Sequence, residues 1–368
     1  MRILLDYRPA LRERTGVGEY VHELASALAR HLDPSDTLTL LSSSWKDRLE
    51  GGRVAGAVVR DLRIPVRVLN LAWHRLGWPP VEMLAGPMDV VHAAHPLLIP
   101  TRRAAQLVTI YDLDFLDHPE RTRAEIRRDY PALARAHAQR ASGVITISDF
   151  TTDEVVRRLG VARERITVCT PGAPAWAPRR APRPGGPILF MGTLEPRKNV
   201  GLLLKAYAAL LERLPSAPPL QVVGAATQAA GPWLRAMAEP PLAGHVEHLG
   251  YIASDKRYDL YSAASMLVLP SHLEGFGLPV LEAMTAGVPV IVSRRGALPE
   301  VAGDAGQIVE PDDEAGLAAA MHRYLTDPAF AAAAAARGLA RARIYSWDAS
   351  AVALHAAYRR ALDRRTGG

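Results

Sequence analysis

The sequence predicts an α/β protein of two domains, each built on a doubly wound, mostly parallel sheet. The chain has 368 residues, which exceeds one comfortable domain and suggests two of about 170–180 residues each. In both halves, short apolar runs of strand length alternate with helical patterns, which is typical of βαβ units. Between the halves, residues 173–187 hold five prolines and no apolar periodicity, so we expect an interdomain linker at 176–187.

The same pattern sets the expected domain boundaries. We expect an N-terminal domain over residues 1–175, a second domain over 188–345, and a terminal helix within 346–368. Apolar residues make up 49% of the chain, which is ample for two hydrophobic cores.

Composition limits the classes of partner. The formal net charge is +6, which favours anionic ligands or lipid headgroups, and no motif indicates nucleic-acid binding. Cys169 is the single cysteine, so an internal disulfide is excluded and a reducing compartment is expected. The apolar run Ile3–Leu5 is too short for a signal peptide, and no window approaches the roughly 20 apolar residues that span a bilayer. We therefore expect a cytoplasmic protein, with peripheral membrane contact as an open possibility.

The N-terminal half opens with a strand, a glycine-bearing loop and a helix. Residues 2–7 form the predicted strand, the loop contains Gly16 and Gly18, and the helix begins near Glu19. A dinucleotide-binding fingerprint is the alternative, but its third glycine is missing and eight residues separate Tyr7 from Gly16. The two glycines are candidates for close approach to a ligand; a plain turn is the other interpretation.

Polar side chains follow the predicted strand at 107–111. Asp112 comes directly after it and His118 lies a few residues further on. Because doubly wound sheets bind ligands at the carboxyl ends of their strands, both residues are candidates for the site. Asp112 could instead cap the next helix, and His118 could be an ordinary loop histidine. A helix is expected over 120–141.

Residues 60–82 mix basic, aliphatic and aromatic side chains. Four arginines and His74 interleave with apolar residues that include Trp73 and Trp78. This mixture suits attachment to a membrane interface. The alternative is a substrate-side loop and helix, with both tryptophans packed in a core and the arginines solvated.

The second half restarts with a strand at 188–191 and a polar turn before a helix at 200–214. Arg197 and Lys198 lie in that turn, where a guanidinium can bind two phosphate oxygens and an ammonium supplies a point charge. The turn is therefore a candidate diphosphate clamp, against the alternative of two solvated cations.

The stretch 266–304 contains the densest set of candidates. A strand at 266–270 is followed by a loop with Gly275 and Gly277, a short helix from about Pro279 to Gly287, a second strand, and a loop that ends at Asp304. Glycines let backbone N–H groups approach a ligand, and a helix N-terminus favours an anion. Two carboxylates, Glu274 and Glu282, flank that predicted anion site.

The run Glu274-Gly-Phe-Gly-Leu-Pro-Val-Leu-Glu282-Ala-Met, followed by Pro299-Glu-Val-Ala-Gly-Asp304, resembles the signature of retaining family 4 glycosyltransferases. The resemblance implies the GT-B fold, in which two Rossmann-like domains face a cleft. It implies that Glu274 lies at the transferred sugar and that Glu282 accepts hydrogen bonds from the nucleotide ribose. The donor-binding loop implied by the resemblance comprises Gly275, Phe276, Gly277 and Leu278.

The resemblance assigns roles elsewhere as well. It implies that the Gly16–Gly18 loop closes over the donor phosphates, that Lys198 binds them, and that the backbone of residues 248–252, which include Tyr251, lines the base pocket. It implies that the last helix crosses back onto the first domain. Members of the family often carry His-Asp where this chain has Tyr111-Asp112, so it stays open whether Tyr111 or His118 fills that place. Asp112, His118 and Glu274 are the catalytic candidates.

The expected function is transfer of a hexose from a nucleotide-diphosphate sugar to a saccharide or lipid-linked acceptor, with retention of configuration. Residues 192–199 resemble bacterial mannosyl- or rhamnosyl-type enzymes of surface polysaccharide assembly, which favours a GDP-mannose-like donor. No cofactor is expected, and no aspartate pattern for a bridging metal stands out. A nucleotide-sugar epimerase and a non-catalytic nucleotide-sugar binder are the alternatives.

Overall fold

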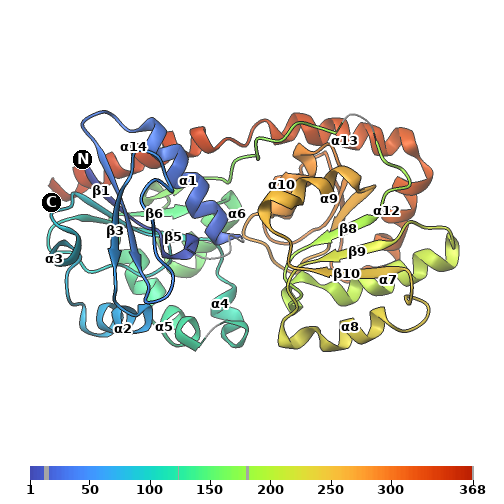
Figure 1. Ribbon diagram of the computed structural model, residues 1–368, viewed down its shortest axis with the longest axis horizontal. Helices are drawn as coiled ribbons and strands as arrows, with labels where there is room; N and C mark the ends of the chain where they lie inside the picture. The colour runs from blue at the N-terminus through green and yellow to red at the C-terminus, as the bar shows by residue number, and fades with distance from the viewer. Residues whose placement is uncertain (12–15, 123, 180–181, 367–368) are drawn as a thin grey trace. The chain divides into compact units, whose positions relative to one another are not determined.

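The computed structural model describes residues 1–11, 16–122, 124–179 and 182–366. Part of the predicted glycine loop before Gly16 and part of the predicted linker therefore lie outside the described residues. The chain divides into two compact units. Unit 1 comprises Met1–Gly172 and Ser346–Gly368, and unit 2 comprises Ala173–Tyr345. The two parallel α/β sheets that the sequence predicts are confirmed, one in each unit (Figure 1).

Unit 1 is built on a seven-stranded parallel sheet with the order β3-β2-β1-β4-β5-β6-β7. Its helices cover both faces: α1 packs with α14 on one, and the buried core on the other joins residues of α2, α3 and α5 (Figure 1). The strands are β1 (Arg2–Asp6), β2 (Thr37–Ser43), β3 (Val58–Leu62), β4 (Val90–Ala93), β5 (Ala105–Ile110), β6 (Gly143–Thr146) and β7 (Ile166–Val168). The helices are α1 (Val17–His31), α2 (Val66–Leu71), α3 (Glu82–Ala85), α4 (Asp114–Asp117), α5 (Ala124–Arg140), α6 (Asp149–Glu154) and α14 (Trp347–Thr366).

Unit 2 is built on a six-stranded parallel sheet with the order β10-β9-β8-β11-β12-β13. Helices α7, α8 and α12 pack together, as do α10, α11 and α13 (Figure 1). The strands are β8 (Ile188–Met191), β9 (Leu220–Val223), β10 (Val246–Gly250), β11 (Met266–Leu269), β12 (Val290–Ser293) and β13 (Gln307–Val309). The helices are α7 (Val200–Arg213), α8 (Gly231–Met237), α9 (Arg257–Ala263), α10 (Leu278–Thr285), α11 (Leu298–Ala302), α12 (Glu314–Thr326) and α13 (Pro328–Ala342).

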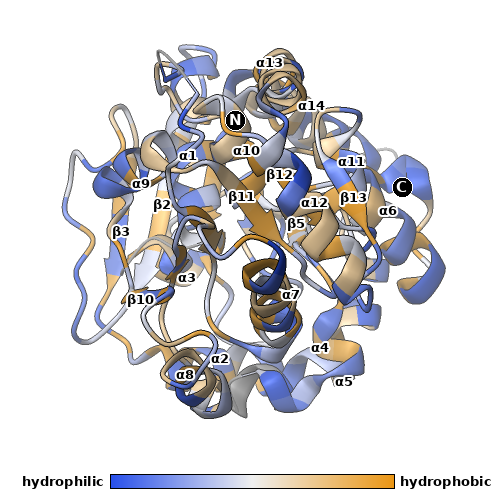
Figure 2. Ribbon diagram, turned by 90° about the vertical axis from the view of Figure 1, so that its right-hand side faces the viewer, coloured by the Kyte–Doolittle hydropathy of each residue, from blue (hydrophilic) through white to orange (hydrophobic). Residues whose placement is uncertain are grey.

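Both sheets have helices on both faces, so their central strands are buried along almost their whole length. Every residue of β11 is buried, and the strand is coloured as hydrophobic in Figure 2. The helices carry local start signals: Asp313 and Asp327 cap α12 and α13 by accepting the backbone N–H of Gly316 and Phe330. Within the described residues, every helix is too short or too polar to cross a membrane.

One local expectation was wrong, and a second was right only in part. The segment predicted as a loop before Asp304 contains α11, because Pro299 occupies the first helical turn, where its missing N–H is not needed. The segment 60–82 begins with the edge strand β3 and continues as α2 and a π-helical turn at Ala72–Leu76. Its two tryptophans behave differently, since Trp73 is 2% exposed and Trp78 is 59% exposed.

Three histidines of unit 1, of which His92 and His137 are buried and His95 is 13% exposed, predict acid sensitivity. Burial lowers the pKa of His92 and His95 to about 3 and that of His137 to about 4. His137 Nδ1 accepts the N–H of Leu98 at 2.9 Å, a bond that protonation of Nδ1 would break. Because the unfolded chain protonates near pH 6.5, it binds more protons than the folded chain below that pH. The free energy of unfolding is therefore unaffected by these histidines above pH 6.5, and it decreases as the pH falls from 6.5 toward 4.

We expect His137→Asn, whose amide oxygen can replace Nδ1 as acceptor, to reduce this pH dependence. The measurement is the thermal unfolding midpoint between pH 7.5 and 4.5, in which each titrating proton changes stability by about 1.4 kcal/mol per pH unit. The control is His118→Asn, because the side chain of His118 is 41% exposed. Equal slopes for wild type and His137→Asn would contradict the assignment.

Candidate functional site

In unit 2 the strand order reverses between β8 and β11, which are hydrogen-bonded neighbours. Ligands of open α/β sheets bind at such a switch point, outside the carboxyl ends of the strands. The turn that carries Arg197 and Lys198 follows β8, and the loop that carries Glu274 follows β11. Parallel pairing therefore brings together two sequence candidates that are 76 residues apart.

Glu274 is the centre of this cluster. Its side chain is 8% exposed, and Lys198 Nζ donates to Oε1 at 2.6 Å. Arg197 Nη1 lies 3.2 Å from Oε2 and also donates to the carbonyl of Leu273 at 2.8 Å. Ser271 Oγ donates to Oε1 at 2.7 Å. Both oxygens of the carboxylate are therefore held by cations.

These contacts fix the charge of Glu274. Burial by itself raises the pKa of the carboxyl, but the charges of Lys198 and Arg197 and the hydrogen bonds from Lys198 and Ser271 outweigh burial and lower the pKa to about 2. Glu274 is consequently an anion throughout the neutral range, suited to accepting hydrogen bonds rather than donating a proton.

Helix α10 begins beside this cluster in the chain. Gly277 precedes the helix with φ 110°, a conformation that L side chains rarely adopt, and Leu278 is the first helical residue. The Phe276 side chain is 3% exposed, and its ring packs edge-on against Tyr345 at 5.3 Å. Phe276 therefore shapes the loop from the core side, while Gly275 and Gly277 keep the backbone free of side chains.

Glu282 lies on α10 and belongs to a different set of contacts. Its Oε1 is paired with Arg257 Nη1, and its Oε2 accepts a hydrogen bond from Tyr261 Oη at 2.7 Å. Sequence reasoning missed both partners, which come from α9, as well as Ser271. Tyr251, the candidate beside the base pocket, follows β10 and is 37% exposed.

Unit 1 contains a second polar cluster, which sequence reasoning also missed. Its sheet reverses order between β1 and β4, and Asp6, Arg8 and His95 lie at the carboxyl ends of these strands. Arg8 donates to Asp6 through Nε at 2.7 Å and Nη2 at 2.9 Å, and to Asn70 through Nη1 at 2.8 Å. His95 Nε2 lies 3.1 Å from Arg8 Nη2. Burial raises the pKa of Asp6, but Arg8 outweighs it and holds that pKa below its usual value.

A histidine–aspartate pair adjoins this cluster. His74 Nδ1 lies 3.1 Å from Asp129 Oδ2, and the His74 ring is in edge contact with His95 at 6.1 Å between centroids. The side chain of His74 is 4% exposed, and in the described structure its Nε2 has no hydrogen-bond partner. A buried nitrogen without a partner is costly unless a ligand or water satisfies it.

The remaining candidates are also in unit 1. Asp112 accepts the N–H of Asp114, the first residue of α4, at 3.2 Å, and His118 lies 3.2 Å from Glu120. Tyr111 donates to the carbonyl of Ala94 at 3.3 Å, and burial raises its pKa well above the usual value. The glycines, Gly16 and Gly18, precede and begin α1, and a Cβ on Gly18 would lie 2.8 Å from the Pro9 carbonyl oxygen.

Among the described residues, one group has three possible metal ligands close together: Asp33, Asp36 and His355. Asp36 is already paired with the N-terminal amino group and with His355, and Asp33 is paired with Arg359. These contacts account for the group without an ion.

Comparisons with known proteins agree with this architecture. Residues 15–172 match the family described as "Glycosyl transferase 4-like domain", and residues 186–327 match "Glycosyl transferases group 1". O-antigen chain mannosyltransferase B of Escherichia coli is 28% identical, over 95% of this chain and 97% of the relative. A glycogen synthase of Mycobacterium tuberculosis is 31% identical, over 97% of this chain and 94% of the relative. The solved sucrose-phosphate synthase of Thermosynechococcus elongatus aligns with a TM-score of 0.77 at 21% identity, covering 97% of this chain and 98% of that one.

Proposed function

This chain belongs to the glycosyltransferases of family 4, and we propose that it moves a hexose from a GDP-mannose-like donor to a saccharide or lipid-linked acceptor with retention of configuration. The observation that carries the proposal is the buried, ionised Glu274 held between Lys198 and Arg197 at the switch point of unit 2. The mannosyltransferase relative from Escherichia coli supports the choice of sugar.

We assign the donor as follows. Lys198 and Arg197 bind the diphosphate together with the backbone at the start of α10, and Glu274 accepts a hydrogen bond from the hexose. Glu282 accepts hydrogen bonds from the ribose; because each carboxylate oxygen has two lone pairs, it can do so while Arg257 and Tyr261 hold it in place. Tyr251 lies beside the base, and the loop with Gly16 and Gly18 closes over the phosphates.

The chemical step follows from these charges. Cleavage of the sugar–phosphate bond leaves negative charge on the departing diphosphate. Two fixed cations and the N-terminus of α10 stabilise that charge, at roughly 3 kcal/mol for each preorganised donor. We propose that these cations neutralise the diphosphate in place of a divalent metal ion. Turnover is therefore expected to continue when a chelator is present.

We propose that unit 1 binds the acceptor. Asp112 and His118 are candidates for contacts with it, and His74 and His95 add a buried polar surface at the switch point between β1 and β4. His74 Nε2 is buried without a hydrogen-bond partner in the described structure, and we propose that binding of the acceptor brings a hydroxyl group to it.

The decisive experiment offers the protein a panel of GDP-, UDP- and ADP-hexoses, with and without saccharide acceptors and EDTA. Acceptor-dependent release of GDP from GDP-mannose, with an α-linked product by NMR, is the expected result. Conversion of the sugar without acceptor would indicate an epimerase. Binding without release under every condition would indicate a non-catalytic binder.

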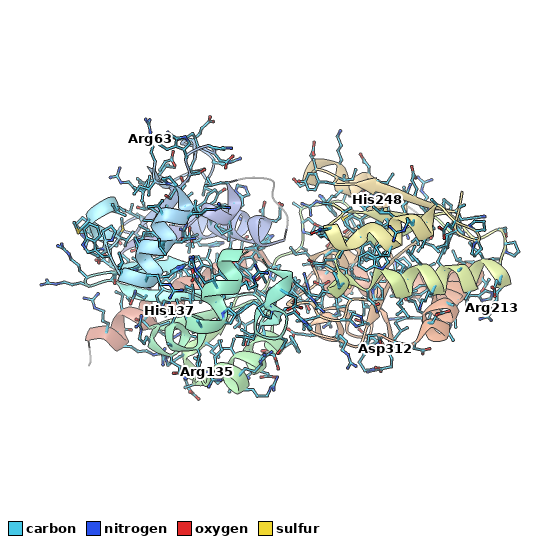
Figure 3. The ribbon with its side chains drawn as sticks, turned by 90° about the horizontal axis from the view of Figure 1, so that it is seen from below. Arg63, Arg135, His137, Arg213, His248 and Asp312 are labelled. Carbon is cyan, nitrogen blue, oxygen red and sulfur yellow. The ribbon has the colours of Figure 1, made fainter. Side chains whose placement is uncertain are left out.

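We also propose that residues 60–82 hold unit 1 against an anionic membrane. This short stretch contains four exposed large apolar residues, among them Leu76 and Trp78, and its four arginines are exposed. Arg63 projects from this side of the unit in Figure 3. Basic residues near an anionic surface contribute about 1 kcal/mol each, and apolar side chains add burial in the interface.

Leu76→Glu with Trp78→Glu is therefore expected to abolish flotation with vesicles that contain phosphatidylglycerol. Flotation with vesicles of phosphatidylcholine alone, which carry no net charge, shows how far binding depends on the anionic lipid. Ile344→Glu, at an apolar residue of unit 2 that is 65% exposed, is the matched control. Equal flotation of all three proteins would contradict the proposal.

A further inference from the structure

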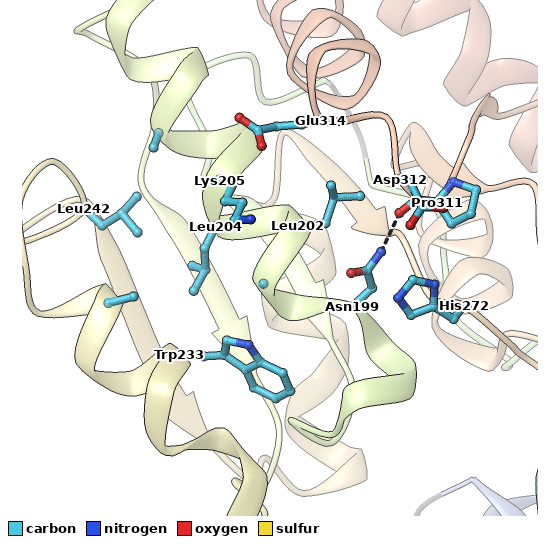
Figure 4. Close-up of a pocket in the computed structure, with 13 residues that line it drawn as sticks. Asn199, Leu202, Leu204, Lys205, Trp233, Leu242, His272, Pro311, Asp312 and Glu314 are labelled. Carbon is cyan, nitrogen blue, oxygen red and sulfur yellow. Dashed lines mark hydrogen bonds between the residues drawn. The ribbon is translucent and has the colours of Figure 1, made fainter. Parts of the chain in front are cut away.

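Unit 2 contains a pocket that the proposed donor site does not use. It has a volume of about 680 Å³ and lies between α7, α8 and the segment that leads into α12 (Figure 4). This volume is within the range of roughly 300–1,000 Å³ typical of small-molecule sites. Leucine and alanine side chains form part of its walls, and its polar groups are contributed by Asn199, Lys205, Trp233, His272, Asp312 and Glu314.

The side chains of the pocket select the chemistry of the ligand. Trp233 lies at one side and offers an indole ring close to Gly201, where a Cβ would come within 3.2 Å of the indole nitrogen (Figure 4). Asp312 and Glu314 are exposed carboxylates, and Lys205 is an exposed cation. One cation against two carboxylates disfavours a phosphate or a nucleotide.

A neutral, polyhydroxylated ligand fits this combination. Carboxylates accept hydrogen bonds from hydroxyl groups, and the ammonium of Lys205 donates to hydroxyl oxygens. The C–H face of a sugar ring carries partial positive charge and matches the negative face of an indole.

The pocket is connected to the donor site by the chain itself. Asn199 follows Lys198, and its amide donates to the carbonyls of Pro311 at 2.8 Å and of Pro270 at 3.2 Å. The backbone N–H of His272 donates to the carbonyl of Arg197 at 2.8 Å. Asn199 and His272, which line the pocket, therefore belong to the same segments as Lys198 and Glu274.

We infer that this pocket is a second saccharide site, which binds a neutral stretch of the growing acceptor or product chain. The inference rests on the proposed transferase function, and it predicts that saccharide held there raises the efficiency of transfer to long acceptors. The inference also predicts that transfer to an acceptor of one or two sugars does not depend on the pocket.

The test measures binding of α-linked manno-oligosaccharides of two to eight units by saturation-transfer NMR and calorimetry, in the full chain. Trp233→Ala is expected to weaken binding of the longer oligosaccharides at least about tenfold. Asp312→Asn with Glu314→Gln, at two exposed positions, is expected to weaken it as well. The control is Trp45→Ala, which removes an indole that is 74% exposed in unit 1.

The kinetic arm compares GDP release with short and long acceptors. A loss of GDP release confined to long acceptors in the Trp233 variant supports the inference. An equal loss with short and long acceptors overturns it. Unchanged oligosaccharide binding in both pocket variants, or no binding by the wild type at millimolar concentration, also overturns it. Failure of the proposed function gives a different result, since no nucleotide is then released by wild type with any acceptor.

Discussion

Lys198→Met is expected to lower the turnover number for GDP release by at least about 100-fold, the usual loss when one preorganised donor to a developing anion is removed. Lys198 is the most buried cation of the cluster at Glu274, with 10% of its side chain exposed. A buried ammonium close to the departing diphosphate interacts with it more strongly than a solvated one. Glu274→Gln is expected to lower turnover to a similar degree, because the amide loses the charge that orients both cations.

Both substitutions are also expected to change the stability of the protein. Breaking a buried ion pair leaves one charge without its partner and typically costs about 3–5 kcal/mol of stability. Either single variant is therefore expected to melt at a lower temperature. The double variant, Lys198→Met with Glu274→Gln, leaves neither charge and is expected to recover most of that stability while remaining inactive.

Lys256→Met provides the control, since Lys256 is an exposed cation of the same unit. Steady-state GDP release and thermal unfolding are measured on the wild type and on all four variants. Near wild-type turnover in a folded Lys198 variant would remove the proposed role of this residue. If the double variant recovered turnover together with its melting temperature, the pair of Lys198 and Glu274 would have only a structural role.

The sequence identified the parts of this site whose geometry is local. Pro279 predicted the first turn of a helix, and α10 begins at Leu278, because first-turn preferences depend on adjacent residues. The spacing of Glu274 and Glu282 likewise placed one carboxylate in the loop and one on the helix.

The contacts that decide the chemistry could not be obtained in this way. Glu282 is held by Arg257 and Tyr261, on a helix 21–25 residues earlier, and nothing in their spacing marks them as partners. Arg8 meets His95 across 87 residues only because β1 and β4 are neighbours in the sheet. Strand order is a property of the whole domain. The one available signal was that Asp6 ends the first strand and Arg8 follows it closely, at the edge where ligands of such sheets bind.

Gly296→Ala is expected to lower turnover by about 100-fold, through displacement of Glu274 rather than loss of any functional side chain. Gly296 has φ 60°, and a Cβ there would lie 2.4 Å from the carbonyl oxygen and 2.6 Å from the backbone nitrogen of Glu274. The neighbouring N–H of Ala297 donates to that same carbonyl at 2.9 Å. Since both clashing atoms belong to the backbone, the loop must shift as a whole, and the carboxylate moves away from Lys198 and Arg197.

Gly244→Ala separates this displacement from ordinary backbone strain. Gly244 is in the same unit with φ 81°, and a Cβ there would have no heavy atom within 4 Å. Both variants carry the left-handed penalty of roughly 1–2 kcal/mol, so both are expected to lose stability. Only Gly296→Ala is expected to lose turnover, measured as GDP release at a temperature where both are folded. Equal turnover in the two variants would mean that the loop tolerates the shift. Turnover would then not depend on the exact position of Glu274.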